Sequence, residues 1–312
     1  MQTQRRAVID VGTNSIKLLV ADVEGGRVQP VLEQSKQTRL GRGFYPAQRL
    51  QPKAIAATAQ AVAHFAGTAK SAGAVTSRVI ATSAARDAIN REELIKAIHD
   101  VAGLTVEVIA GEKEADLVFR GVSTDPDLTT QRLLILDVGG GSSEFILGEA
   151  GKKIYAASVP LGSVRLLEML TVSDPPSERE FSDACAWVRN MVDTRVRPNL
   201  QPLRAGNNDV EPRLMGVGGA ASILARIEHS LPDFNREVID ATRLGRGRVN
   251  ELTRKLWSLP LNDRRKIIGL PPNRADVLLM GTVIFLVIME AFDFTELRVS
   301  TRGLRFAAVL DE

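Results

Sequence analysis

The sequence has few of the residues on which several common kinds of site depend. Its 312 residues include one cysteine, three histidines, two tryptophans and two tyrosines. A single thiol cannot form an internal disulfide, which suits a reducing compartment, so we expect a cytoplasmic protein. Three histidines and one cysteine also argue against a zinc site with the usual ligands.

Long apolar runs and dense basic runs are missing as well. The longest apolar run, Val277–Met289, is shorter than the ~20 residues needed to cross a bilayer, and it predicts a buried core helix instead. No apolar signal region precedes the first strand. The net charge is only +3, and the basic residues are dispersed rather than gathered into a stripe. We therefore expect neither a membrane nor nucleic acid as a partner.

Two short segments carry most of the positive information. One reads DVGTNS from Asp10 and the other reads DVGGGSS from Asp137, and each lies between two apolar runs. Either could be an ordinary β-hairpin turn, and the first alone is as consistent with such a turn as with a phosphate-binding loop. The D-V-G-x-x-S pattern recurs after 127 residues, however. The repeat favours a duplicated domain with one phosphate-binding loop in each half, in which glycine lets backbone N–H groups approach an anion.

The rest of the chain alternates predicted strands and helices, which indicates an α/β protein. Helices are expected over residues 51–72, 83–102, 177–195 and 276–291, a linker over 123–131 and a loop over 198–212. The length fits two domains. We predict one domain at residues 1–125 and a second at 126–301, with a C-terminal helix at 302–312 that packs back on the first.

Further segments point to a known family. They include the ATSAARDAIN run from Ala81, the GEKEA run from Gly111 and the LGSVR run from Leu161. With the two loops, they make the chain resemble the exopolyphosphatase/guanosine pentaphosphate phosphohydrolase family of the actin-like ATPase superfamily. The resemblance implies two ribonuclease H-like domains with the active site in an interdomain cleft. It also implies release of terminal phosphate with Mg²⁺, or with Mn²⁺ as an alternative. Longer relatives append helical domains, which we do not expect here.

The resemblance also assigns roles to individual residues. Glu114 matches the family's catalytic glutamate, which would orient and deprotonate the attacking water; on position alone it is an acidic residue in a first helical turn. Asp137 matches the metal-binding aspartate. Glu144 and Asp10 are further metal candidates, with a solvated strand residue and a cap of its own loop as the respective alternatives. The phosphate-binding candidates are Gly12, Thr13, Asn14, Ser15, Arg86, Gly139, Gly140, Gly141, Ser142 and Ser143.

These assignments favour a Mg²⁺-dependent exopolyphosphatase acting on short polyphosphate chains. A guanosine pentaphosphate (pppGpp) 5′-phosphohydrolase is the near alternative. A non-hydrolytic nucleotide-binding regulator on the same fold is a more distant one, because a pure binder needs no water-aligning carboxylate. A sugar kinase would need an aspartate base and an adenosine site that the sequence does not indicate. A homodimer is left open.

Overall fold

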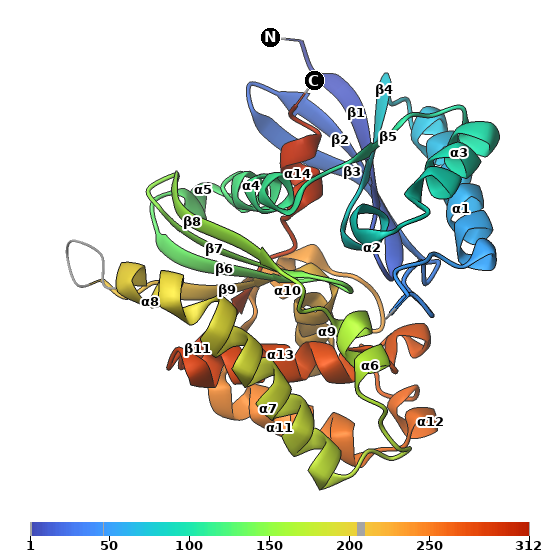
Figure 1. The fold of residues 1–312 in the computed structure, drawn as a ribbon. Helices are drawn as coiled ribbons and strands as arrows, with labels where there is room; N and C mark the ends of the chain where they lie inside the picture. Colours follow the sequence, from blue (N-terminus) through green and yellow to red (C-terminus); the bar gives the residue numbers. More distant parts are fainter. Residues whose placement is uncertain (1, 46, 205–209, 312) are drawn as a thin grey trace. The chain divides into compact units, whose positions relative to one another are not determined.

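The computed structural model describes residues 2–45, 47–204 and 210–311. The chain divides into two compact units (Figure 1). The first comprises Met1–Pro126 together with Arg302–Glu312, and the second comprises Asp127–Thr301. The expected boundary after residue 125 lies one residue before this division. Each unit has one mixed β-sheet with helices packed against it.

The first unit is built on a five-stranded sheet in the order β3-β2-β1-β4-β5. Strand β1 is central, antiparallel to β2 and parallel to β4, so the end of β1 lies beside the end of β4. Helices α1 and α3 lie on one side of the sheet, and α4 with α14 lies on the other (Figure 1). The strands are β1 (Gln4–Val11), β2 (Ser15–Glu24), β3 (Arg27–Gln37), β4 (Thr76–Ala81) and β5 (Val106–Val108). The helices are α1 (Pro52–Ser71), α2 (Ser83–Asp87), α3 (Arg91–Ala102), α4 (Gly111–Val122) and α14 (Leu304–Ala308).

The second unit has a six-stranded sheet in the order β10-β11-β9-β6-β7-β8. Strand β6 takes the place that β1 has in the first unit, antiparallel to β7 and parallel to β9. The strands are β6 (Arg132–Val138), β7 (Ser143–Glu149), β8 (Lys152–Val159), β9 (Arg213–Val217), β10 (Arg243–Gly245) and β11 (Glu296–Val299). The helices are α5 (Pro126–Thr129), α6 (Ser163–Met169), α7 (Glu178–Arg195), α8 (Arg197–Arg204), α9 (Gly218–Glu228), α10 (Arg236–Ala241), α11 (Arg246–Ser258), α12 (Leu261–Arg264), the short 3₁₀ helix Pro272–Arg274 and α13 (Leu278–Ala291).

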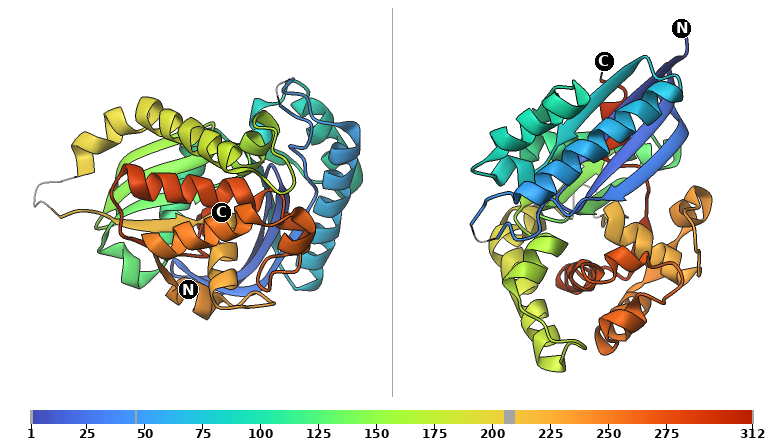
Figure 2. Two further views of the ribbon diagram at one scale, coloured as in Figure 1. Left: turned by 90° about the horizontal axis from the view of Figure 1, so that it is seen from below. Right: turned by 90° about the vertical axis from the view of Figure 1, so that its right-hand side faces the viewer.

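Helix α13 forms the centre of the second unit's core. Every residue in it except Glu290 is buried. It packs against α7 and α11 (Figure 2). The expectation of a buried core helix here is therefore confirmed, and in the described part of the chain no helix is both long and apolar enough to cross a membrane.

Two expectations about elements are wrong. The helix expected over residues 83–102 is two helices, because the chain turns extended at Ala88 and the buried side chain of Asn90 binds both backbone groups of Leu50. The loop expected over 198–212 contains most of α8, whose Leu200 is fully buried in the core. Positions 205–209 of that loop lie outside the described residues.

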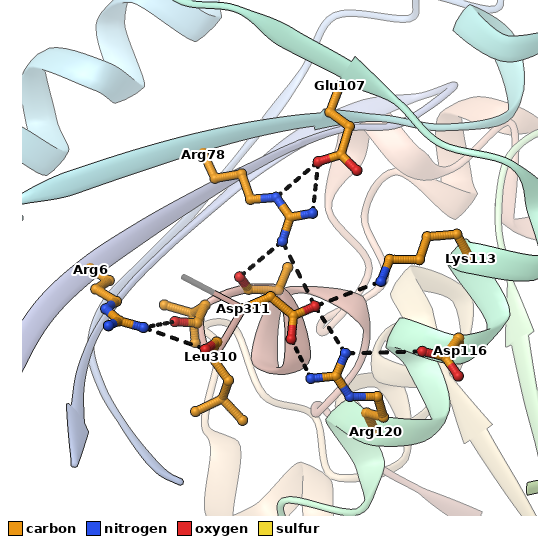
Figure 3. Close-up of polar contacts among 10 residues, drawn as sticks. Arg6, Arg78, Glu107, Lys113, Asp116, Arg120, Leu310 and Asp311 are labelled. Atoms are coloured by element: carbon orange, nitrogen blue, oxygen red, sulfur yellow. Dashed lines mark hydrogen bonds and ion pairs between the residues drawn. The ribbon is translucent and has the colours of Figure 1, made fainter. Parts of the chain in front are cut away.

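The C-terminal segment holds α4 in place (Figure 3). Gly121 of α4 approaches the Gly303 backbone so closely that a Cβ atom would lie 2.1 Å from its carbonyl oxygen. The Asp311 carboxylate accepts a hydrogen bond of 2.9 Å from Arg120 Nη1 and lies 3.8 Å from Lys113 Nζ, and both residues belong to α4. It also lies 3.9 Å from Arg78 Nη1, which anchors the segment to the sheet. This matters for the site because α4 also carries Glu114.

Candidate functional site

The loop between β6 and β7 is held by its carbonyl oxygens. The turn is closed by a hydrogen bond of 3.0 Å from Gly139 N–H to Ser142 O. The carbonyl groups of the three glycines in the loop accept hydrogen bonds from the start of α6. Their donors and distances are Ser163 N to Gly139 O at 3.0 Å, Val164 N to Gly140 O at 2.8 Å and Arg165 Nε to Gly141 O at 2.8 Å. All three loop carbonyls therefore face the start of α6.

This arrangement turns a row of N–H groups in the opposite direction. In a trans peptide the C=O of one residue and the N–H of the next point to opposite sides. The N–H groups of Gly140, Gly141 and Ser142 thus point away from α6, and within the described residues no protein acceptor meets them. Successive N–H groups of this kind form a concavity that binds anions. Glycine at position 162 permits the close approach of the loop to the start of α6, since a Cβ there would lie 2.4 Å from the Gly140 oxygen.

The loop between β1 and β2 follows the same plan. Gly12 N–H closes the turn on Ser15 O at 3.1 Å. Thr13 O accepts from Gly41 N at 2.7 Å, which directs the following N–H, that of Asn14, away from the supporting segment. In both loops an outside segment thus binds the carbonyl groups and leaves N–H groups directed outward.

The side chains of this first loop add unpaired donors. Ser15 Oγ and Asn14 Nδ2 are buried and have no hydrogen-bond partner within the described residues, while Asn14 Oδ1 accepts from Gln37 Nε2 at 3.1 Å. Buried polar groups in folded proteins nearly always have a partner. Donors left over in this way fit a ligand that supplies only acceptors, as phosphate does.

Some donor groups of the predicted phosphate-binding loops have internal partners. The N–H groups of Gly12 and Gly139 close their own turns, and the hydroxyl of Ser143 donates to Leu161 O. These groups fix the shape of the two loops.

Two acidic side chains lie on one face of the sheet beside the second loop. Asp137 and Glu144 are register partners across the β6–β7 hairpin, so their side chains lie on the same face of the sheet. Glu144 is only 1% exposed and accepts from Ser158 Oγ at 2.8 Å, so its alternative as a solvated strand residue is wrong. Two carboxylates, with water and phosphate oxygens completing the shell, are a donor set that suits Mg²⁺.

Asp137 is closely packed on its other side. Gly218, at the start of α9, has a φ of +87°, and a Cβ there would lie 2.4 Å from Asp137 Oδ1. Only glycine leaves room for the carboxylate at this distance. The glycine-containing turn at 216–219 therefore adjoins the metal candidate.

Asp10 lies in the first unit, opposite Lys17 on β2. Burial raises the pKa of the Asp10 carboxyl, because it disfavours the charged form, while Lys17 and Arg305 act in the other direction. Within the described ranges no cluster of three or more Asp, Glu, His or Cys could hold a metal ion by itself.

Glu114 and Arg86 form a close pair in the first unit. Arg86 Nη1 donates to Glu114 Oε2 at 2.8 Å and to Ile109 O at 3.2 Å, so two anchors hold the guanidinium. The Glu114 side chain is 11% exposed. The arginine predicted to bind phosphate thus contacts the predicted catalytic glutamate and fixes the direction of its carboxylate.

Comparison with known proteins identifies the family. The model of the Ppx/GppA phosphatase family matches residues 19–312. The chain belongs to this family. Exopolyphosphatase 2 of Mycobacterium tuberculosis is 33% identical over 295 residues, which cover 91% of this chain and 89% of that protein.

Solved structures agree with this assignment. An exopolyphosphatase from Cytophaga hutchinsonii has a TM-score of 0.88 at 26% identity, covering 98% of this chain and 97% of that one. The Ppx/GppA enzyme of Aquifex aeolicus has a TM-score of 0.79 at 27% identity, and the comparison covers all of both chains. The predictions of the family and of two α/β domains of the actin-like ATPase superfamily are confirmed.

Sequence reasoning missed the segments that support the loops of this Ppx/GppA protein. Arg39 and Gly41 bind carbonyls of the first loop and residues 163–165 bind those of the second, although neither segment was assigned that part. The run from Leu161 to Arg165 was recognised only as a family segment. A signal was present in Gly162, because a glycine after a strand and before a helix often marks close backbone approach.

Proposed function

We propose that the chain is a Mg²⁺-dependent exopolyphosphatase that releases terminal orthophosphate from inorganic polyphosphate, with a preference for short chains. The observation that carries the proposal is the pair of loops whose carbonyls are bound by the protein, while outward N–H groups of both loops and the Ser15 hydroxyl and Asn14 amide of the first remain for an acceptor. Polyphosphate offers a row of such acceptors. The relatives named exopolyphosphatase support the same substrate class.

In this proposal each group has one task. The N–H groups and hydroxyls of the two loops bind phosphate oxygens and align the terminal phosphate. Glu114 accepts the proton of the attacking water at a carboxylate oxygen, and Arg86 keeps that carboxylate in one direction. Asp137 and Glu144 would hold Mg²⁺, which neutralises phosphate charge when bound. Mn²⁺, with similar oxygen ligands, is the alternative ion.

Hydrolysis of pppGpp to release its 5′-terminal phosphate is the second candidate, because the same loops would bind its triphosphate. It is favoured less, since aromatic residues that could stack on guanine make up only 4% of the chain. A non-hydrolytic regulator is disfavoured by the ordered contact between Arg86 and Glu114, for which a simple binder has no use.

A substrate panel tests the proposal. Phosphate release is measured on short polyphosphate, long polyphosphate, pppGpp and ATP, each with Mg²⁺, with Mn²⁺ and with chelator. We expect the highest kcat/KM on short polyphosphate and no turnover with chelator. A higher kcat/KM on pppGpp would replace the proposed substrate, and full activity in chelator would remove the metal from the proposal.

A further inference from the structure

Ser83, outside the two loops, has a buried hydroxyl that no group among the described residues pairs. Ser83 is 3% exposed, and its Oγ makes no hydrogen bond within the described residues. Leaving a hydroxyl buried and unpaired costs free energy, so such groups in folded proteins need an explanation. Ser83 lies in the family segment that begins at Ala81, of which sequence reasoning used only Arg86.

The backbone places Ser83 against the first loop. It opens α2, directly after β4. The residue before it, Thr82, donates from its N–H to Val11 O at 3.2 Å, at the end of β1. The residue after it, Ala84, donates to Thr13 Oγ1 at 3.3 Å, in the loop itself. Ser83 is thus fixed between two residues that both bind the β1 end of the site.

Its lack of a partner is shared with its neighbours. Within the described residues, Asn14 Nδ2 and Ser15 Oγ are buried without a hydrogen-bond partner in the same way as Ser83 Oγ. Each of these three residues is more than nine-tenths buried. Two hydroxyls and one amide around one loop could all donate to a single ligand that is rich in acceptor atoms.

We propose that Ser83 Oγ donates a hydrogen bond to a phosphoryl oxygen of the bound polyphosphate, and so extends the first loop into a phosphate subsite. The inference rests on the proposed function and adds a residue to it. A hydroxyl can rotate toward whichever phosphoryl oxygen is nearest, and it needs no cationic side chain. A hydrogen bond to a charged acceptor of this kind is among the stronger ones in proteins.

The test compares Ser83→Ala with Ser77→Ala, a serine at the other end of β4. Because Ser83 Oγ has no partner in the free protein, Ser83→Ala should not lower the Tm, while the KM for short polyphosphate should rise about 10- to 100-fold. Ser77→Ala should change neither. An unchanged KM in Ser83→Ala overturns the inference. A clear fall in Tm also overturns it, because the hydroxyl would then be structural.

A binding measurement separates this inference from the proposed function. Calorimetry with tripolyphosphate is run on Glu114→Gln and on Glu114→Gln/Ser83→Ala, where no turnover is needed. Binding weakened about 10-fold or more by the second change supports Ser83 even if the wild-type chain releases no phosphate. Equal binding by the two variants rejects Ser83 and leaves the proposed function standing. No binding by either rejects both.

Discussion

At the scale of single residues, Glu114 has a close matched control in Glu112, two positions earlier and exposed in the same helical turn. Glu114→Gln keeps the shape of the side chain and its contact with Arg86 but cannot accept a proton. We expect kcat on polyphosphate to fall roughly 10²- to 10⁴-fold with KM nearly unchanged, as for a lost general base. Steady-state kinetics check this. Near-normal turnover in Glu114→Gln, or an equal loss in Glu112→Gln, would show that Glu114 is not the general base.

Asp137 is tested by the metal it is proposed to hold. Asp137→Asn replaces a charged ligand with a neutral one while Glu144 remains, so the Mg²⁺ concentration for half-maximal activity should rise and the maximum should fall. Asp183→Asn, on the exposed face of α7, serves as the control and should leave the titration unchanged. Identical Mg²⁺ midpoints for wild type and Asp137→Asn would show that Asp137 is not a ligand.

Part of this residue-scale geometry follows from the sequence. A hairpin that turns at 139–142 pairs Asp137 with Glu144 by simple counting, so their common face could be predicted. The contact between Arg86 and Glu114 could not, because it joins two helices 28 positions apart along the chain. The direction of the loop N–H groups depends on outside segments that bind the carbonyls, and local sequence does not report such contacts.

At the scale of elements, the helix expected from residue 177 begins as its sequence indicates. Ser177 and Glu180 form a capping box, and the donors of Ser177 and Ser173 lower the pKa of Glu180 from 4.5 to about 2. A lowered pKa stabilises the fold fully above 4.5, and this contribution is lost as pH falls from 4.5 toward 2.

The lowered pKa of Glu180 predicts how the stability that this cap contributes changes with pH. Glu180→Gln should lower the urea midpoint at pH 7, and the difference from wild type should shrink as the pH is taken from 5 to 3. Urea titrations followed by circular dichroism check it. Glu178→Gln, at the next acidic position of the same turn, is the control. A difference that stays constant across this range would mean that the carboxylate charge contributes nothing to the cap.

Elements whose ends are set by distant contacts were the ones that sequence reasoning missed. Helix α13 was predictable because its apolar run is longer than any other in the chain and is bounded by charged residues. The break between α2 and α3 depends on the contact of Asn90 with Leu50, and α8 depends on burying Leu200. The first contact joins residues 40 positions apart, and the second is a burial that only the folded core provides. Local propensity alone therefore misleads at both positions.

At the scale of the whole molecule, the two units repeat one design. In each, a central strand ends at a glycine loop and begins a meander of three antiparallel-paired strands, and it pairs in parallel with a strand on its other side. The recurrence of D-V-G-x-x-S after 127 residues is the sequence trace of this repeat. What differs is the chemistry beside each loop. The first unit has Glu114 and Arg86, and the second has Asp137 and Glu144.

The charge balance of the whole chain bears on how it would handle a polymer. Lysine and arginine total 40 against 37 acidic residues, and many arginines are committed to carboxylates, as in the pairs of Arg132 with Glu149 and Arg248 with Glu228. A processive enzyme would need a long basic track to keep hold of the shortened chain. Loops with N–H and hydroxyl donors hold only a few phosphates each.

We therefore expect distributive hydrolysis, with better activity on short polyphosphates than on long polymers and weaker hydrolysis of pppGpp. Because a site that contacts few phosphates releases few counterions, KM should also depend only weakly on KCl concentration. Product ladders on a gel decide the first point. A population that shortens gradually together agrees with the expectation. Full-length chains that persist beside free phosphate, with few intermediates, would contradict it and would require a polyphosphate track beyond the two loops.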